Sequence, residues 1–195
     1  MPANDKLRKC LDEGARGGDR HQGLRRIDPN QKLAEGHVEK MLKNFQAITD
    51  FRDSGHSDWS ASAAFYTLYH GLLAILAQRG YESRNQSCTF ALIESLIIKG
   101  EIKLLSIEDS KEIFEKDVSE DIAHSEKIRD IRETMQYSTK TCLEEEEFQE
   151  LKERTKQLME KVRQELERSY LFSTLRSSVT RSLIKEVKFR RNSTG

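Results

Sequence analysis

Residues 62–83 read SAAFYTLYHGLLAILAQRGYES and are the most apolar stretch of a very polar chain. Apolar residues recur at helical spacing on two sides of this segment, so a helix here is apolar around most of its circumference. Such a helix is typical of the centre of a helical bundle. Ser57 or Asp58 is a suitable first cap, and Gly80 a suitable left-handed residue after the last turn.

The same stretch has to be weighed as a membrane span. Its apolar part, residues 61–77, spans about 26 Å as a helix, slightly short of a hydrocarbon core of about 30 Å. It also contains Thr67, His70 and Gly71. We therefore predict a central core helix and no membrane span.

The remainder of the chain also has a helical pattern. Of its 195 residues, 34% are charged and 36% are apolar, and the only prolines are Pro2 and Pro29. Charged, proline-poor sequence with helical spacing predicts an all-α fold. Caps and apolar spacing place the other helices at residues 29–51, at 87–99, from 106 to about 122, at 128–135 and from about 144 onward, with a break or bend at 123–125.

Charge divides the chain into three parts although the net charge is zero. Residues 1–27 hold seven Lys/Arg and four Asp/Glu (+3), and residues 176–195 hold six and one (+5), which leaves −8 for residues 28–175. We expect a mobile basic arm at 1–27, a bundle at 28–170 and a basic amphipathic tail at 171–195. The tail is suited to a membrane surface, an acidic partner, RNA or its own acidic bundle, and the alternative is a frayed end that packs on nothing.

The cysteines and histidines give no sign of a metal site. Cys10, Cys88 and Cys142 are far apart, form no CxxC pair and follow no signal-peptide pattern, which predicts reduced thiols in a cytoplasmic protein. The five histidines form no HxxxH or HExxH pair, and no Gly-rich phosphate loop or nucleophile elbow occurs. We predict neither a metal nor a cofactor.

Two segments resemble the HEPN domain, a helical-bundle family common in prokaryotes. Residues 58–97 resemble the core of that family, through its helix of the form Ala-x-x-x-Tyr-x-x-x-Tyr/Phe-His and the Gly-containing turn that follows. Residues 129–137, RDIRETMQY, resemble its Arg-to-Tyr segment. The residues of the first segment that carry the resemblance are Ser62, Ala63, Tyr66, Tyr69, His70, Leu73 and Gly80.

The resemblance implies an up-and-down bundle of four to five helices, usually a homodimer. Here that bundle is residues 28–170, followed by an additional C-terminal amphipathic helix. Many members pair with small nucleotidyltransferases as toxin–antitoxin systems. Many others are metal-independent RNases with Arg-x(4–6)-His, in which histidine acts as base on the 2′-hydroxyl and arginine stabilises the phosphate charge.

This chain departs from the RNase pattern. Arg16 and His21 have a suitable spacing but lie in the N-terminal arm, and Tyr137 stands where an RNase has histidine. With an unperturbed pKa of about 10, tyrosine is a poor base at neutral pH. Catalysis is therefore left undecided and leans toward absent, with Arg132 and Tyr137 as weak catalytic candidates.

The same segment has the residues for a ligand site. Arg129, Arg132 and Gln136 form a polar stripe beside a buried one, and two arginines with an amide suit a phosphate or nucleotide. Tyr137, Tyr69 and His70 complete the predicted ligand-binding set. The competing interpretation places Arg132 in ion pairs with the acidic bundle and the aromatic residues in the core.

The sequence thus predicts a cytoplasmic HEPN-domain homodimer without catalytic activity. It would be the partner of a small nucleotidyltransferase, or an RNA- or nucleotide-binding component of a toxin–antitoxin or defence system. One alternative is a divergent metal-independent RNase using Arg132 and Tyr137, with His70. Another is a purely structural interaction bundle, or one that docks through its basic C-terminal helix.

Overall fold

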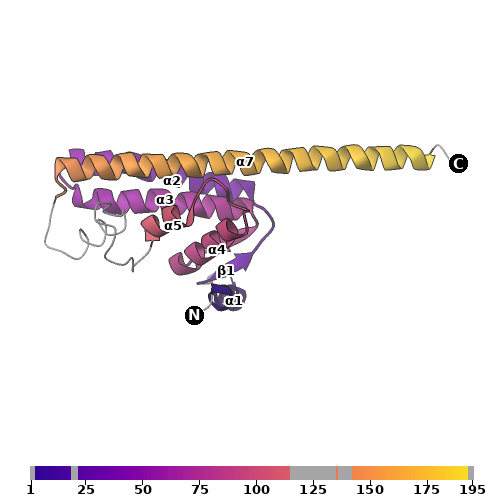
Figure 1. Ribbon diagram of the computed structural model, residues 1–195, viewed down its shortest axis with the longest axis horizontal. Helices are drawn as coiled ribbons and strands as arrows, with labels where there is room; N and C mark the ends of the chain where they lie inside the picture. The colour runs from indigo at the N-terminus through magenta and orange to yellow at the C-terminus, as the bar shows by residue number, and fades with distance from the viewer. Residues whose placement is uncertain (1–2, 19–21, 115–134, 136–141, 193–195) are drawn as a thin grey trace.

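The computed structural model describes residues 3–18, 22–114, 135 and 142–192, with side chains from residue 5 to residue 169. Apart from one two-stranded ribbon the described elements are helices, which confirms the predicted all-α bundle (Figure 1). In chain order they are α1 (Ala3–Arg16), β1 (Leu24–Arg26), α2 (Gln31–Asp53), α3 (Asp58–Gln78), β2 (Tyr81–Ser83), α4 (Gln86–Ile98), α5 (Ile107–Phe114) and α7 (Glu145–Asn192).

Helix α3 is the central helix that its composition predicts. Phe65, Leu68 and Ile75 have no exposed surface, and the helix packs against both α2 and α7. Gly80 follows it with φ of 81°, as expected for a left-handed residue after a helix. By length and composition α3 is the one described helix able to cross a membrane, but 83% of its apolar window is buried inside the protein.

Helix α2 begins two residues later than the predicted start at Pro29. The cap is Asn30, whose side-chain oxygen accepts a hydrogen bond from Leu33 N at 2.9 Å. The same arrangement starts α4, where Asn85 accepts from Cys88 N at 3.0 Å. Asparagine is as good an N-cap as serine or aspartate. The first residues of α2 and α4 therefore lie close to the predicted ones but not at the same positions.

The first 27 residues differ from the predicted mobile arm. They contain α1 and β1, and β1 pairs antiparallel with β2 so that Leu24 lies opposite Ser83. A disulfide between Cys10 and Cys88 links α1 to α4. The prediction of three reduced thiols is therefore wrong for these two cysteines, whereas Cys142 is free and exposed.

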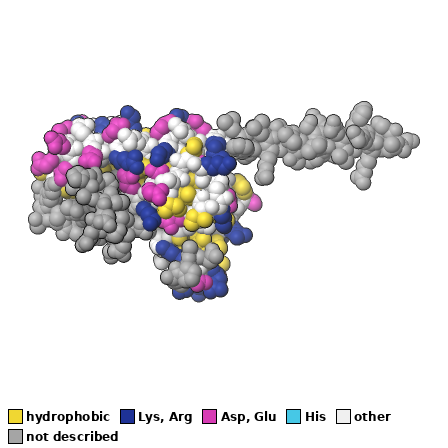
Figure 2. All heavy atoms as spheres, in the orientation of Figure 1, with side chains coloured by type: hydrophobic (Ala, Val, Ile, Leu, Met, Phe, Trp, Pro, Cys, Tyr) yellow, Lys and Arg dark blue, Asp and Glu magenta, His cyan; other side chains and the backbone are white. Residues whose placement is uncertain are grey.

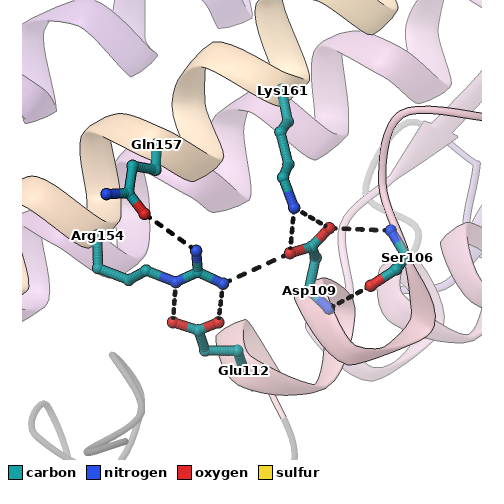
Figure 3. Close-up of polar contacts among 6 residues, drawn as sticks. All are labelled: Ser106, Asp109, Glu112, Arg154, Gln157 and Lys161. Atoms are coloured by element: carbon teal, nitrogen blue, oxygen red, sulfur yellow. Dashed lines mark hydrogen bonds and ion pairs between the residues drawn. The ribbon is translucent and has the colours of Figure 1, made fainter.

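A network of charged side chains holds α5 against α7 (Figure 3). Ser106 and Asp109 form the predicted capping box, with Asp109 N donating to Ser106 Oγ at 3.1 Å and Ser106 N to Asp109 Oδ2 at 3.0 Å. Lys161 Nζ lies 2.8 Å from both oxygens of Asp109. Arg154 binds Glu112 through two hydrogen bonds of 2.7 and 2.6 Å. The bidentate geometry fixes the orientation of α5.

Helix α7 runs without interruption through two regions of different sequence. In its first half the predicted stripe is buried; Phe148, Leu158 and Val162 are at most 1% exposed. The predicted amphipathic segment at 171–191 is helical, but it continues α7 rather than forming a separate helix. The predicted bend at 123–125 lies outside the described residues.

Candidate nucleic-acid interface

The imidazoles of His37 and His70 meet between α2 and α3. Their Nδ1 atoms are 3.2 Å apart, and the rings stack with centroids 5.4 Å apart. In such a contact one nitrogen donates a proton and the other accepts it, so at least one ring is neutral. The pair is thus a direct side-chain contact between α2 and α3.

Both histidines are held in the neutral form. Burial lowers the pKa of His70 to about 4, with further contributions from the charges of His37 and Lys40. Burial also lowers the pKa of His37, together with Lys40, while the carboxylate of Glu82 acts in the opposite direction. Near pH 7 the pair is therefore uncharged and able to form hydrogen bonds.

Aromatic side chains follow the same side of the two helices. Trp59, Tyr66 and His70 recur at i, i+7 and i+11 and so share a face of α3; Trp59 is 58% and Tyr66 41% exposed. The ring of Phe51 on α2 lies 6.4 Å from that of Trp59. We call this surface the α2–α3 flank; its residues are His37, Lys40, Asn44 and Phe51 of α2 and Trp59, Ser62, Tyr66 and His70 of α3.

An open pocket lies at the His37 end of the flank. It has a volume of about 450 Å³ and is formed by the first turns of α2, with lining residues Asn30, Lys32, Leu33, Gly36, His37 and Lys40. Lys32 and Lys40 are both exposed. Two ammonium groups beside a neutral imidazole suit a phosphate-bearing ligand, because lysine binds phosphate as a point charge.

The structure separates Tyr69 from His70, which the sequence had grouped in one ligand site. Adjacent helical residues point about 100° apart, and Tyr69 faces the core with 8% exposure. Its hydroxyl lies 3.3 Å from Thr89 Oγ1, and its ring stacks on Phe90. Burial raises the pKa of Tyr69. Tyr69 therefore has a packing role, and His70 alone lies on the flank.

The other predicted site residues, Arg129, Arg132, Gln136 and Tyr137, lie outside the described residues and remain predictions. Met135 is described and is buried, as its place in the apolar stripe predicts. Within the described ranges, no three His, Cys, Asp or Glu side chains are grouped so that they could hold a metal ion.

Sequence reasoning missed His37, Lys40 and Trp59 as site residues. The spacing of Trp59 with Tyr66 and His70 was visible in the sequence and identifies one helix face. The contact of His37 with His70 was not visible, because it depends on the alignment of two helices 33 residues apart in sequence.

The fold and flank define a helical-bundle domain built around an aromatic and histidine-bearing central helix. The HEPN domain family model matches residues 34–166. This match covers more than half of the chain, and the protein belongs to the HEPN family. Comparisons with curated proteins and with solved structures gave no match. The matched range includes the whole flank, and it excludes α1, the first residues of α2 and the second half of α7.

Proposed function

We propose that this HEPN protein binds RNA or a nucleotide through the α2–α3 flank and does not cleave it. One observation carries the proposal: the exposed rings of Trp59 and Tyr66 lie on the same flank as the pocket that contains Lys32 and Lys40. Stacking surfaces beside cationic groups are the two components with which proteins hold single-stranded nucleic acid.

The flank and the pocket at its end have distinct roles in this proposal. Lys32 and Lys40 neutralise phosphate charge, and the His37–His70 pair offers a neutral hydrogen-bonding edge. Tyr66 and Trp59 stack on bases, a contact worth about 1–3 kcal/mol for each base. From Trp59 to His70 the face extends about 16 Å at 1.5 Å per residue, which is room for more than one nucleotide.

The histidine pair is poorly suited to RNA cleavage. A general base or acid works best with a pKa near the working pH, whereas burial lowers the pKa of His70 to about 4. The pair is also engaged with itself at 3.2 Å. Together with tyrosine at position 137, these features favour binding over catalysis.

The wider setting follows from the family and is also a proposal. We propose that the protein is a cytoplasmic homodimer and the partner of a small nucleotidyltransferase in a toxin–antitoxin or defence system. Co-expression with the neighbouring open reading frame tests this setting. Co-purification of a nucleotidyltransferase-like protein would support it, and a neighbour of another class with no stable complex would count against it.

Binding is tested with a fluorescent single-stranded RNA and anisotropy at low salt. Lys40→Glu and Tyr66→Ala are each expected to weaken binding about tenfold, as loss of a phosphate contact or of one stacked base implies. Lys43→Glu is the matched control, because Lys43 lies on the same helix and changes the net charge equally but pairs with Glu39 at 2.7 Å. Equal losses in Lys40→Glu and Lys43→Glu would show that the flank has no special role.

A further inference from the structure

The two-stranded ribbon continues the path of the antiparallel helices α2 and α3. Within the helices, His37 meets His70. Just beyond them, Ile27 N donates to Gly80 O at 2.9 Å. The adjoining residues on each side form the first pair of the ribbon, in which β1 and β2 are antiparallel. The ribbon is therefore the direct extension of the α2–α3 pair past the pocket at the end of the flank.

The ribbon and the residues beside it carry positive charge. In the described stretches 22–30 and 81–85 the cations are Arg25, Arg26 and Arg84, and the carboxylates are Asp28 and Glu82. Arg26 and Arg84 are exposed. Glu82 accepts a hydrogen bond from Arg84 Nε at 3.1 Å and lies opposite Arg25 in the ribbon. Figure 2 shows Lys and Arg side chains around the lower lobe, where Figure 1 places α1 and β1. The two lysines of the pocket add to this charge.

The ribbon lies close to the pocket. Only four residues, at most about 14 Å of extended chain, separate Arg26 from Asn30, the first lining residue of the pocket. Burial and the charge of Lys40 lower the pKa of His37, and the charge of Glu82 on β2 acts against them. The ribbon is thus near the imidazole that lines the pocket, so that one extended ligand can contact both.

Close backbone packing holds the ribbon in place. A Cβ at Gly14 would overlap the carbonyl oxygen of Leu24, and a Cβ at Gly23 would overlap that of Cys10. Helix α1 and strand β1 therefore approach as closely as glycine allows, and the disulfide from Cys10 to Cys88 ties α1 to α4. The arginines of the ribbon are presented by an ordered segment, which lowers the entropy cost of binding a ligand.

We propose that the ligand of the flank is an RNA strand several nucleotides long, whose backbone continues from the pocket onto the ribbon, where Arg26 and Arg84 bind phosphate groups. This inference rests on the proposed function and names the ligand class that the flank alone leaves open. A mononucleotide contacts the pocket, whereas an oligonucleotide contacts both pocket and ribbon. Arginine suits this role, because its planar guanidinium binds phosphate through two parallel hydrogen bonds. The family match begins at residue 34, so β1 is an addition of this chain to the family domain.

Binding of RNA strands of different length by the full chain tests the proposal. Affinities for a uridine dodecanucleotide and a tetranucleotide are measured by titration at several salt concentrations. Arg26→Gln/Arg84→Gln is expected to weaken binding of the dodecanucleotide by about tenfold or more, through the loss of two charge-assisted contacts, and to leave the tetranucleotide unaffected. Each phosphate contact on a single strand adds about 0.7 to the slope of log K against log salt, so this slope is expected to decrease by about 1.4 for the dodecanucleotide.

Arg8→Gln/Lys9→Gln is the matched control. It removes the same charge from the same lobe, but Arg8 and Lys9 are exposed on α1 and point away from its buried residues, Cys10 and Gly14. Its affinity for the dodecanucleotide and its salt slope are expected to equal those of the wild type. The single variant Arg26→Gln changes one exposed side chain and is expected to lower the slope by about 0.7.

Three results would overturn the role of the ribbon and leave the flank as a binding site. The first is dodecanucleotide binding that Lys40→Glu weakens and Arg26→Gln/Arg84→Gln does not. The second is an equal loss in the α1 control, because net charge alone would then explain the binding. The third is uridine monophosphate bound as tightly as the dodecanucleotide. A wild type that binds none of these ligands would refute the proposed function itself, and this inference with it.

Discussion

The carboxylate of Glu165 on α7 binds the guanidinium of Arg79 at the end of α3, with Oε1 and Nη2 2.6 Å apart. Glu165 has no exposed surface. Its second oxygen accepts hydrogen bonds from the backbone N–H groups of Lys103 and Leu104, and Arg168 donates to the first. Burial acts to raise the pKa of Glu165, but these donors and the charge of Arg79 outweigh it and keep the pKa below its usual value.

Glu165→Ala is therefore expected to destabilise the protein by about 3–5 kcal/mol, the usual cost of leaving one partner of a buried ion pair uncompensated. Urea unfolding followed by circular dichroism measures this change. Arg163→Ala is the control, because its pairs with Glu160 and Glu167 are solvent-exposed. Similar urea midpoints for the two variants would mean that the buried ion pair of Glu165 adds no more stability than an exposed one.

Two helical glycines provide a matched test of the packing. A Cβ at Gly71 would lie 2.7 Å from Val162 Cγ1 and 3.0 Å from Met41 Sδ, whereas one at Gly36 would meet nothing within 4 Å. Gly71→Ala is expected to destabilise by about 1–3 kcal/mol through overpacking. Gly36→Ala is expected to stabilise the protein by about 0.4–1 kcal/mol, because alanine lowers the conformational entropy of the unfolded chain. Stabilisation by both substitutions would place α2, α3 and α7 farther apart than described.

The link between Cys10 and Cys88 closes a long loop, since the two residues are 78 positions apart. A chain-entropy estimate gives about 4.5 kcal/mol for a loop of this size. Cys10→Ser and added reductant are each expected to lower the melting temperature, and Cys142→Ser to leave it unchanged.

Thiol counting decides the redox state directly. Alkylation of the denatured, unreduced protein is expected to label Cys142 alone. Labelling of all three cysteines would instead support the reduced, cytoplasmic state predicted from sequence. Disulfides persist mainly in oxidising compartments, so this count also bears on the proposed cytoplasmic location.

The histidine pair predicts a pH dependence of stability. Burial, with the charges of His37 and Lys40, lowers the pKa of His70 in the folded protein to about 4, from 6.5 in the free side chain. As the pH falls below 6.5, His70 is therefore protonated in the unfolded chain but stays neutral in the folded protein. The free energy of unfolding is highest above pH 6.5 and decreases as the pH falls toward 4. Between pH 7 and pH 5 the melting temperature of the wild type is expected to decrease more than that of His70→Gln. Parallel curves for the two proteins would show that His70 titrates normally.

Much of the bundle was predictable from local signals. The central helix, the glycine that follows it, the Ser106–Asp109 capping box and the buried stripe of α7 depend on residues close in sequence. The fold of the N-terminal segment could not be predicted in this way. There, β1 is held by pairing with β2, and α1 is held by a disulfide to α4. Those contacts join residues about 60 to 80 positions apart and leave no periodic signal.

The candidate site was predictable only in part. The tyrosines and histidine of the central helix were identified by resemblance, but which of them point outward depends on packing. Tyr69 turns toward Thr89, whereas Tyr66 and His70 face the flank. The contribution of α2, through His37 and Lys40, required the alignment of two helices in space.

Binding of RNA without cleavage is the central claim, and one incubation tests it. The full chain is mixed with end-labelled single-stranded RNA in excess chelator at low salt, and the sample is divided between native and denaturing gels. We predict a shifted band on the native gel and intact RNA on the denaturing gel. Chelator-resistant cleavage that disappears in Arg132→Ala would contradict the account in favour of an RNase, and the absence of any shift would contradict RNA binding itself.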